Sequence, residues 1–83
     1  MPEIIREDGI ILFFYSSEPL YKRPHIHAKY ADGQAIFWLW PQVSLQKSAG
    51  LNNKELAKIQ RLVLKYEDVL RRAYDHVIGP KHK

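Results

Sequence analysis

The sequence predicts an α+β domain in which a three- or four-stranded, mainly antiparallel sheet carries a long C-terminal helix on one face. Two observations lead to this prediction. Short apolar and alternating segments fill residues 10–46, and a stripe of apolar side chains spaced three and four residues apart runs through residues 53–78. The 83 residues form one domain, 1–83, because a chain of this length has no room for a second core.

The first strand is expected at about residues 10–15, IILFFY. An apolar run without alternation is typical of a strand that is covered on both faces. Residues 1–9 before it are polar and end in an Asp8-Gly9 turn signal, and the serines and prolines of residues 16–24 indicate a loop.

The next two strands, at about 25–31 and 34–40, are predicted to form a hairpin around an Asp32-Gly33 turn, because Asp-Gly supplies the positive φ angles of a two-residue loop. Counting outward from this turn places His27 opposite Trp38. Because side chains alternate across a sheet, the hairpin has two faces. The apolar face, expected under the helix, carries Ile26, Ala28, Tyr30, Ala35, Phe37 and Leu39. The other face sets basic side chains beside apolar and indole ones: Arg23, His25, His27 and Lys29 beside Ile36, Trp38 and Trp40.

Pro41 ends this pairing, since proline donates no hydrogen bond to a ladder, and a short edge strand fits residues 42–46. The helix is expected over about 53–78. Asn52 can cap it and Glu55 can complete a capping box.

A straight helix over these residues would span about 39 Å. That is long for so small a sheet, so a bend near 66–68 is compatible with the pattern. The helix is followed by a basic tail, 79–83.

Composition bounds the function. The chain has no cysteine, which excludes disulfides, thiolate metal sites and cysteine nucleophiles. Its apolar runs are shorter than the roughly 20 residues of a membrane helix, and its first residues lack a signal-peptide pattern. We therefore expect a cytoplasmic protein without membrane contact. The net charge of +4 makes polyanions plausible partners.

The residues MPEI at the start and PHIHAKY at 24–30 resemble a small bacterial family catalogued as a domain of unknown function, number four-one-six-zero. Members typically have PPHFHxxY where this chain has Arg23 to Tyr30, and the likeness covers nearly the whole chain. The chain departs from the pattern in having Arg23 for the first proline and an apolar IFWLW strand. The resemblance implies an α+β fold, a prokaryotic source and a two-gene, toxin–antitoxin-like setting. It supplies no established activity.

The residues themselves leave three functions open for the face that bears the histidines. The first is an interaction surface, in which Trp38, Trp40, Ile36 and Arg23 bind a partner protein encoded nearby or a second copy of the chain as a homodimer. This function needs no catalysis and no cofactor.

The second is metal-independent RNA cleavage or RNA binding. His25 and His27 would lie about 6.5–7 Å apart along one strand face and act as general acid and base, with Lys29 holding the phosphate. The indoles would stack on unpaired bases.

The third is a metal site, because His25 and His27 in a His-x-His arrangement can ligate one ion. This site needs a third ligand, and no carboxylate lies beside the pair in the sequence. The neighbouring cations Arg23 and Lys29 also oppose cation binding.

Overall fold

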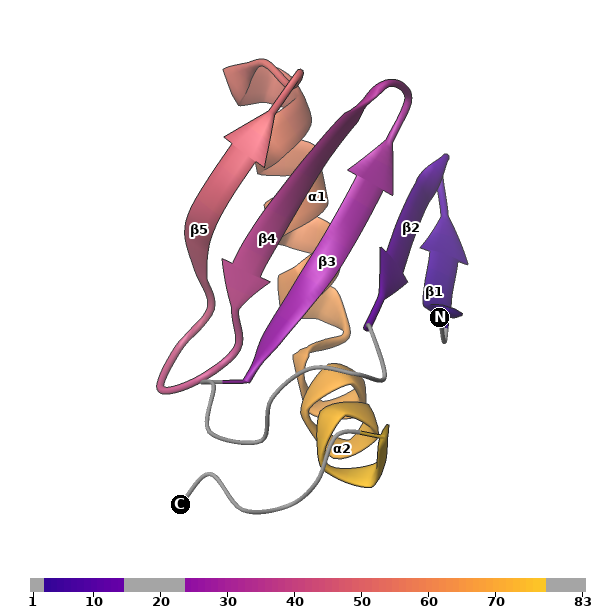
Figure 1. Ribbon diagram of the computed structural model, residues 1–83, viewed down its shortest axis with the longest axis vertical. Helices are drawn as coiled ribbons and strands as arrows, with labels where there is room; N and C mark the ends of the chain where they lie inside the picture. Colours follow the sequence, from indigo (N-terminus) through magenta and orange to yellow (C-terminus); the bar gives the residue numbers. More distant parts are fainter. Residues whose placement is uncertain (1–2, 15–23, 78–83) are drawn as a thin grey trace.

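Five β-strands and two helices follow one another along the chain in the computed structural model, which describes residues 3–14 and 24–77. The strands form one antiparallel sheet in chain order, with α1 crossing one face of it and α2 lying at its end (Figure 1). The elements are β1 (Glu3–Glu7), β2 (Ile10–Phe13), β3 (His25–Tyr30), β4 (Gly33–Trp38), β5 (Ser44–Ala49), α1 (Asn53–Lys65) and α2 (Glu67–Val77). The α+β prediction is confirmed. The sheet has more strands than the predicted three or four.

The additional strand is β1, which pairs with β2 through a two-residue turn at Asp8 and Gly9. Both turn residues have positive φ angles, 53° and 80°, which is what a tight hairpin with the twist of the flanking strands requires. The turn signal in the sequence was therefore correct, but the polar segment before it is a strand.

The β3–β4 hairpin exists, but its register differs from the predicted one by two residues. Tyr30 pairs with Gly33 and His25 pairs with Trp38, so the turn residues are Ala31 and Asp32. Ala31 takes the positive φ of 53°. Gly33 is extended because its backbone is approached by the chain that leaves β5: an ideal Cβ on Gly33 would lie 2.5 Å from the Gly50 carbonyl oxygen.

A shift of two residues keeps every side chain on its predicted face, because the side-chain period of a strand is two. Four predicted core residues of this hairpin are almost fully buried, as is Leu39 just beyond it: Ile26, Ala28, Ala35, Phe37 and Leu39. The prediction of two chemically different faces is therefore confirmed.

Strand β5 pairs with the outer side of β4 and is an exposed edge of the sheet. It begins two residues later than the predicted 42–46 strand. A bulge interrupts its pairing between Ile36 and Phe37 of β4. The predicted bounds rest on the alternation of Val43 and Leu45, whereas nearly all side chains of β5 are exposed, so this alternation does not mark where the strand lies.

The single long helix predicted over 53–78 is wrong: the chain forms two shorter helices that are separated at Tyr66. The capping box of α1 is confirmed, with Asn52 and Glu55 each accepting the other's backbone N–H. A straight helix of about 39 Å would exceed the longest dimension of the fold, 34 Å. The break lies in the region, near 66–68, where the sequence pattern is compatible with a bend, and it lets α2 turn toward the end of the sheet. The predicted tail, 79–83, lies outside the described residues.

The core lies between the helices and one face of the sheet. In Figure 1, α1 crosses behind β4 and β3, and α2 lies at the end of the sheet where β3 begins. The helices contribute Ile59, Leu62, Val63, Leu70 and Tyr74 to this core. No helix among the described residues is long and apolar enough to span a membrane.

Candidate functional site

The sheet face opposite the helices is the candidate site, and we call it the open face. Strand pairing arranges its side chains in rows that cross β2, β3, β4 and β5. The open face consists of Ile11, Phe13, His25, His27, Lys29, Gln34, Ile36, Trp38, Ser44, Lys47 and Ala49.

His25 is buried at the edge of the open face, with 2% of its surface exposed. Its ring centroid lies 5.2 Å from that of His27, 6.1 Å from that of Trp38 and 6.0 Å from that of Tyr74 in α2. Because His25 is the first residue of β3 and lies at the end of the sheet, Tyr74 of α2 can contact it. His25 is thus part of an aromatic cluster that joins the open face to the core.

His27 is half-buried in the next outward position of β3. Its ring stacks on Phe13 of β2, with centroids 5.5 Å apart and planes inclined by 17°. One ring face of His27 is therefore occupied within the sheet, and its side chain also borders a hollow toward β4.

This geometry does not suit the predicted catalytic pair of His25 and His27. A general acid and a general base must both reach the reacting atoms, but His25 is almost inaccessible and the two rings meet edge to face. Lys29 is exposed two residues further along β3, opposite Gln34. The structure brings the three residues onto one strand but presents just His27 and Lys29 at the surface.

The predicted binding residues are only partly brought together. Ile36 and Trp38 lie half-buried on the open face, opposite His27 and His25. Trp40 lies beyond the end of β4 and is 43% exposed, so it does not pair with His25 as the predicted register required. Arg23 lies outside the described residues.

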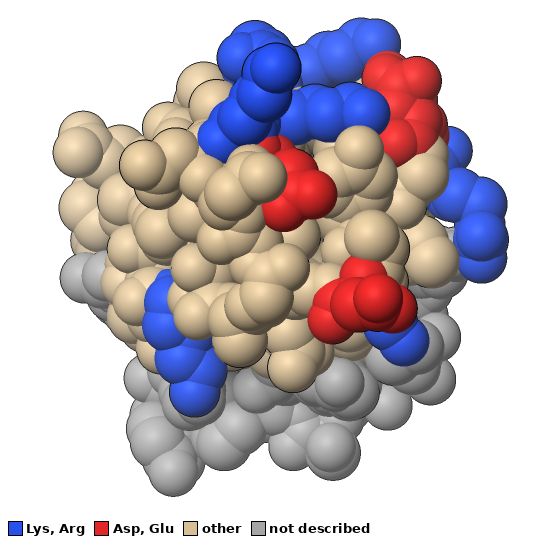
Figure 2. Space-filling model, turned by 90° about the horizontal axis from the view of Figure 1, so that it is seen from above, with Lys and Arg blue, Asp and Glu red and all other residues tan. Residues whose placement is uncertain are grey.

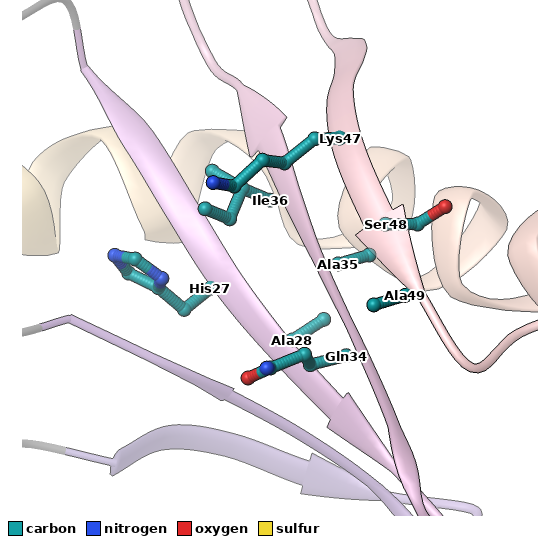
Figure 3. A pocket seen from close by; sticks show the side chains of 8 residues that line it. All are labelled: His27, Ala28, Gln34, Ala35, Ile36, Lys47, Ser48 and Ala49. Carbon is teal, nitrogen blue, oxygen red and sulfur yellow. The ribbon is translucent and has the colours of Figure 1, made fainter.

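A hollow of about 420 Å³ lies on the open face between β3, β4 and β5. Figure 3 shows Lys47 extending from β5 over Ile36 toward β3, with His27 and Gln34 at the border of the hollow. The small side chain of Ala49 lies beside Gln34 in the pairing and leaves this space open. The sequence alone does not identify Lys47 as a residue of this site. Lys47 lies on an exposed edge strand, whose side chains show no apolar pattern from which the pairing with β4 could be predicted.

The charged side chains of strands β2 to β5 are all positive. Strands β2 to β5 contain no aspartate or glutamate, whereas they contain Lys29 and Lys47. Within the described residues, the side chains of Lys29, Lys47 and Gln34 make no hydrogen bond or ion pair. The open face therefore offers unused donors and no competing carboxylate on these four strands.

A metal site does not assemble in the part of the chain that the structure describes. No three histidine, aspartate or glutamate side chains there lie close enough together to hold an ion. The His-x-His pair thus has no third ligand among these residues, and metal sites with two protein ligands are unusual.

A second group of charges lies at the other side of the sheet, where α1 meets the β1–β2 turn. Glu7 accepts hydrogen bonds from the Tyr66 hydroxyl at 2.7 Å and the Lys65 ammonium at 3.0 Å. The hydrogen bond from Tyr66, and after it the one from Lys65, lowers the pKa of Glu7. The same bonds raise the pKa values of Lys65 and Tyr66. Figure 2 views the end of the molecule that carries the hairpin turns and shows lysine and arginine side chains gathered on one side, with acidic ones beside them. The Lys65–Glu7 ion pair and the Tyr66–Glu7 hydrogen bond join α1 to β1, which is a structural role.

The family model described as Domain of unknown function (DUF4160) matches residues 9–75. This span contains β2 to β5 and α1 completely, and therefore the entire open face. No curated protein and no solved structure matches the sequence.

Proposed function

The chain belongs to the DUF4160 family, and from this premise we propose that it is a protein-binding module whose open face receives a partner protein. The partner is the product of an adjacent gene, in a two-gene module of the toxin–antitoxin type. No catalytic step is part of this proposal.

One observation carries the proposal: the helices cover one face of the sheet and leave half-buried apolar side chains on the other. Ile11, Ile36 and Trp38 lie on the open face at intermediate exposure, while α1 crosses the opposite face and α2 lies at the end of the sheet (Figure 1). Apolar side chains left exposed on a sheet face mark interaction sites in soluble proteins, and tryptophan is enriched at their energetic centres.

Self-association through the open face is less favourable than association with a different protein. Two copies packed face to face would bring Lys29 and Lys47 of one chain near the same lysines of the other. With no carboxylate on β2 to β5, these charges would lose water without gaining partners, which costs free energy.

RNA binding is the second candidate, favoured by the same absence of carboxylates and by the lysines. Sheets that bind single-stranded RNA stack bases on exposed aromatic rings. Here Phe13 and His25 are 4% and 2% exposed, and one face of His27 is stacked on Phe13. The more exposed rings are those of Trp38, half-buried on the same face, and Trp40, which lies beyond the end of β4. Both lie at the end of the hairpin away from Lys29, and we therefore take a protein partner as the better fit.

Co-expression with the product of the adjacent gene tests the proposal. Size-exclusion chromatography with light scattering should give a complex of the two chains. Ile36→Asp should abolish it, because it places a charge at the centre of the apolar surface without entering the core. Leu64→Asp is the matched control, since Leu64 is an equally apolar side chain on α1 that is 48% exposed, and it should leave the complex intact. The absence of a complex with the wild-type chain, or equal loss with both variants, would contradict the proposal.

A further inference from the structure

We infer that the partner presents a carboxylate side chain, next to an apolar one, to the hollow beneath Lys47; this inference rests on the proposed function. The hollow lies between β3, β4 and β5 on the open face and holds about 420 Å³. That volume lies at the small end of the range of about 300–1,000 Å³ found for ligand pockets. It suits individual side chains of a partner rather than a whole secondary-structure element.

The donors around the hollow point to an anion. Lys47 extends over Ile36 toward β3, and Gln34 lies at the border of the same hollow (Figure 3). Neither side chain has a hydrogen-bond partner in the part of the chain that the structure describes. An unused ammonium can bind a carboxylate, and the unused amide N–H₂ of Gln34 adds a second donor at another part of the border.

The surrounding charge excludes competition for these donors from the same strands. Asp and Glu are absent from β2 to β5, and Lys29 adds a second exposed cation on the open face. Among the described carboxylates, Glu7 is already engaged with Lys65 and Tyr66, and Glu67 is paired with Arg71. Charge complementarity therefore selects an acidic partner and disfavours a second copy of this chain.

The floor of the hollow distinguishes a protein carboxylate from a nucleic-acid phosphate. Ile36 and Ala49 supply aliphatic surface there. His27 is the one ring among the described residues that line the hollow, and it is stacked on Phe13. An aliphatic surface suits a leucine or valine side chain beside the carboxylate, whereas RNA would need free ring faces for its bases. The occupant is thus an acidic-apolar segment of a protein.

Titration of the full ¹⁵N-labelled chain with synthetic peptides tests this inference. The first probe is a peptide of glutamates around one leucine, and the matched probe replaces each glutamate with glutamine. The glutamate peptide should shift the amide signals of Gln34, Ile36 and Lys47 and bind about tenfold or more tightly than the glutamine peptide. Equal binding of the two peptides, or shifts confined to α1, would overturn the inference.

Variants separate the roles of charge and of the apolar surface. Lys47→Met, which keeps length but removes charge, should weaken binding of the glutamate peptide about tenfold, and Lys47→Arg should restore most of it. Lys54→Met is the control, because Lys54 is an exposed lysine in the first turn of α1. If Lys47→Met and Lys54→Met behave alike, the inference fails.

The same variants distinguish this inference from the function on which it rests. If Ile36→Asp abolishes the complex with the adjacent gene product while Lys47→Met leaves it unchanged, the protein-binding function is supported and the carboxylate of the partner is refuted. If no complex forms, both proposals are refuted. Tighter binding of a single-stranded oligouridine at Gln34 and Lys47 than of the glutamate peptide would assign the site to RNA and overturn both.

Discussion

Replacing Gly33 with alanine should lower the melting temperature by about 8–24 °C. The added Cβ would lie 2.5 Å from the carbonyl oxygen of Gly50 and 2.6 Å from Cγ and Cδ2 of Leu51. The backbone at Gly50, where φ is +73°, must therefore move. Overpacking of a filled site costs about 1–3 kcal/mol, and the upper part of that range, about 2–3 kcal/mol, applies because backbone is involved. Each kcal/mol shifts the melting temperature of a domain of this size by about 4–8 °C.

Ala31→Gly should act in the opposite direction. Ala31 holds a φ of 53°, and an L-residue in this region is strained by about 1–2 kcal/mol. Glycine relieves this strain, but it also raises the conformational entropy of the unfolded state, which lowers the stability by about 0.4–1 kcal/mol. The net stabilisation is about 0.5–1 kcal/mol, or about 2–8 °C.

Thermal unfolding followed by circular dichroism at a fixed pH measures both changes. Gly9→Ala is a useful control, because its Cβ would meet Tyr30 Cε1 at an ordinary 3.4 Å while its φ is +80°. It should lose about 1 kcal/mol, less than Gly33→Ala. A wild-type melting temperature for Gly33→Ala, or a lowered melting temperature for Ala31→Gly, would contradict the turn at Ala31 and Asp32.

Three further predictions concern other parts of the fold. Glu7→Gln should make the melting temperature depend less on pH in the acid range. The Tyr66 hydrogen bond lowers the pKa of Glu7 below 4.5. The Glu7 carboxylate therefore stabilises the fold above pH 4.5, and this stabilisation is lost as the pH falls through the lowered pKa. Melting temperatures between pH 3 and pH 7 check this, and parallel profiles for variant and wild type would contradict it. Asn52→Ala should cost about 1 kcal/mol, because it removes the acceptor of the α1 capping box; urea unfolding would show an unchanged midpoint if the cap were unimportant. His25→Ala should cost about 2–4 kcal/mol because the ring is buried, whereas His27→Ala, at a half-buried position, should cost less than half as much; equal losses in the same unfolding assay would argue against their different environments.

The two faces of the central hairpin could be predicted because they depend on the parity of the register alone. The observed shift of two residues leaves Ile26 on the core side and His27 on the open face. The register itself could not be predicted. Asp8-Gly9 and Asp32-Gly33 are the same dipeptide, yet just the first forms the turn, because the second glycine is needed where the distant Gly50 approaches.

The helix break and the burial of His25 also depend on contacts that are remote in sequence. Tyr66 bonds to Glu7, which lies 59 residues earlier, and His25 is covered in part by Tyr74 of α2. Lys47 was missed for a different reason. A strand exposed along nearly its whole length shows no apolar alternation, so its register is set by pairing with β4 and not by its own pattern.

The most direct test of the open face as the binding surface uses Trp38 as a reporter. Trp40→Phe leaves Trp38, which lies half-buried on the open face, as the single tryptophan of the chain. Acrylamide quenching of its fluorescence is measured before and after addition of an adjacent gene product that has itself been made free of tryptophan. We expect complex formation to protect Trp38 from quenching and to shift its emission to shorter wavelength. A complex that forms by light scattering while the quenching of Trp38 stays unchanged would contradict it.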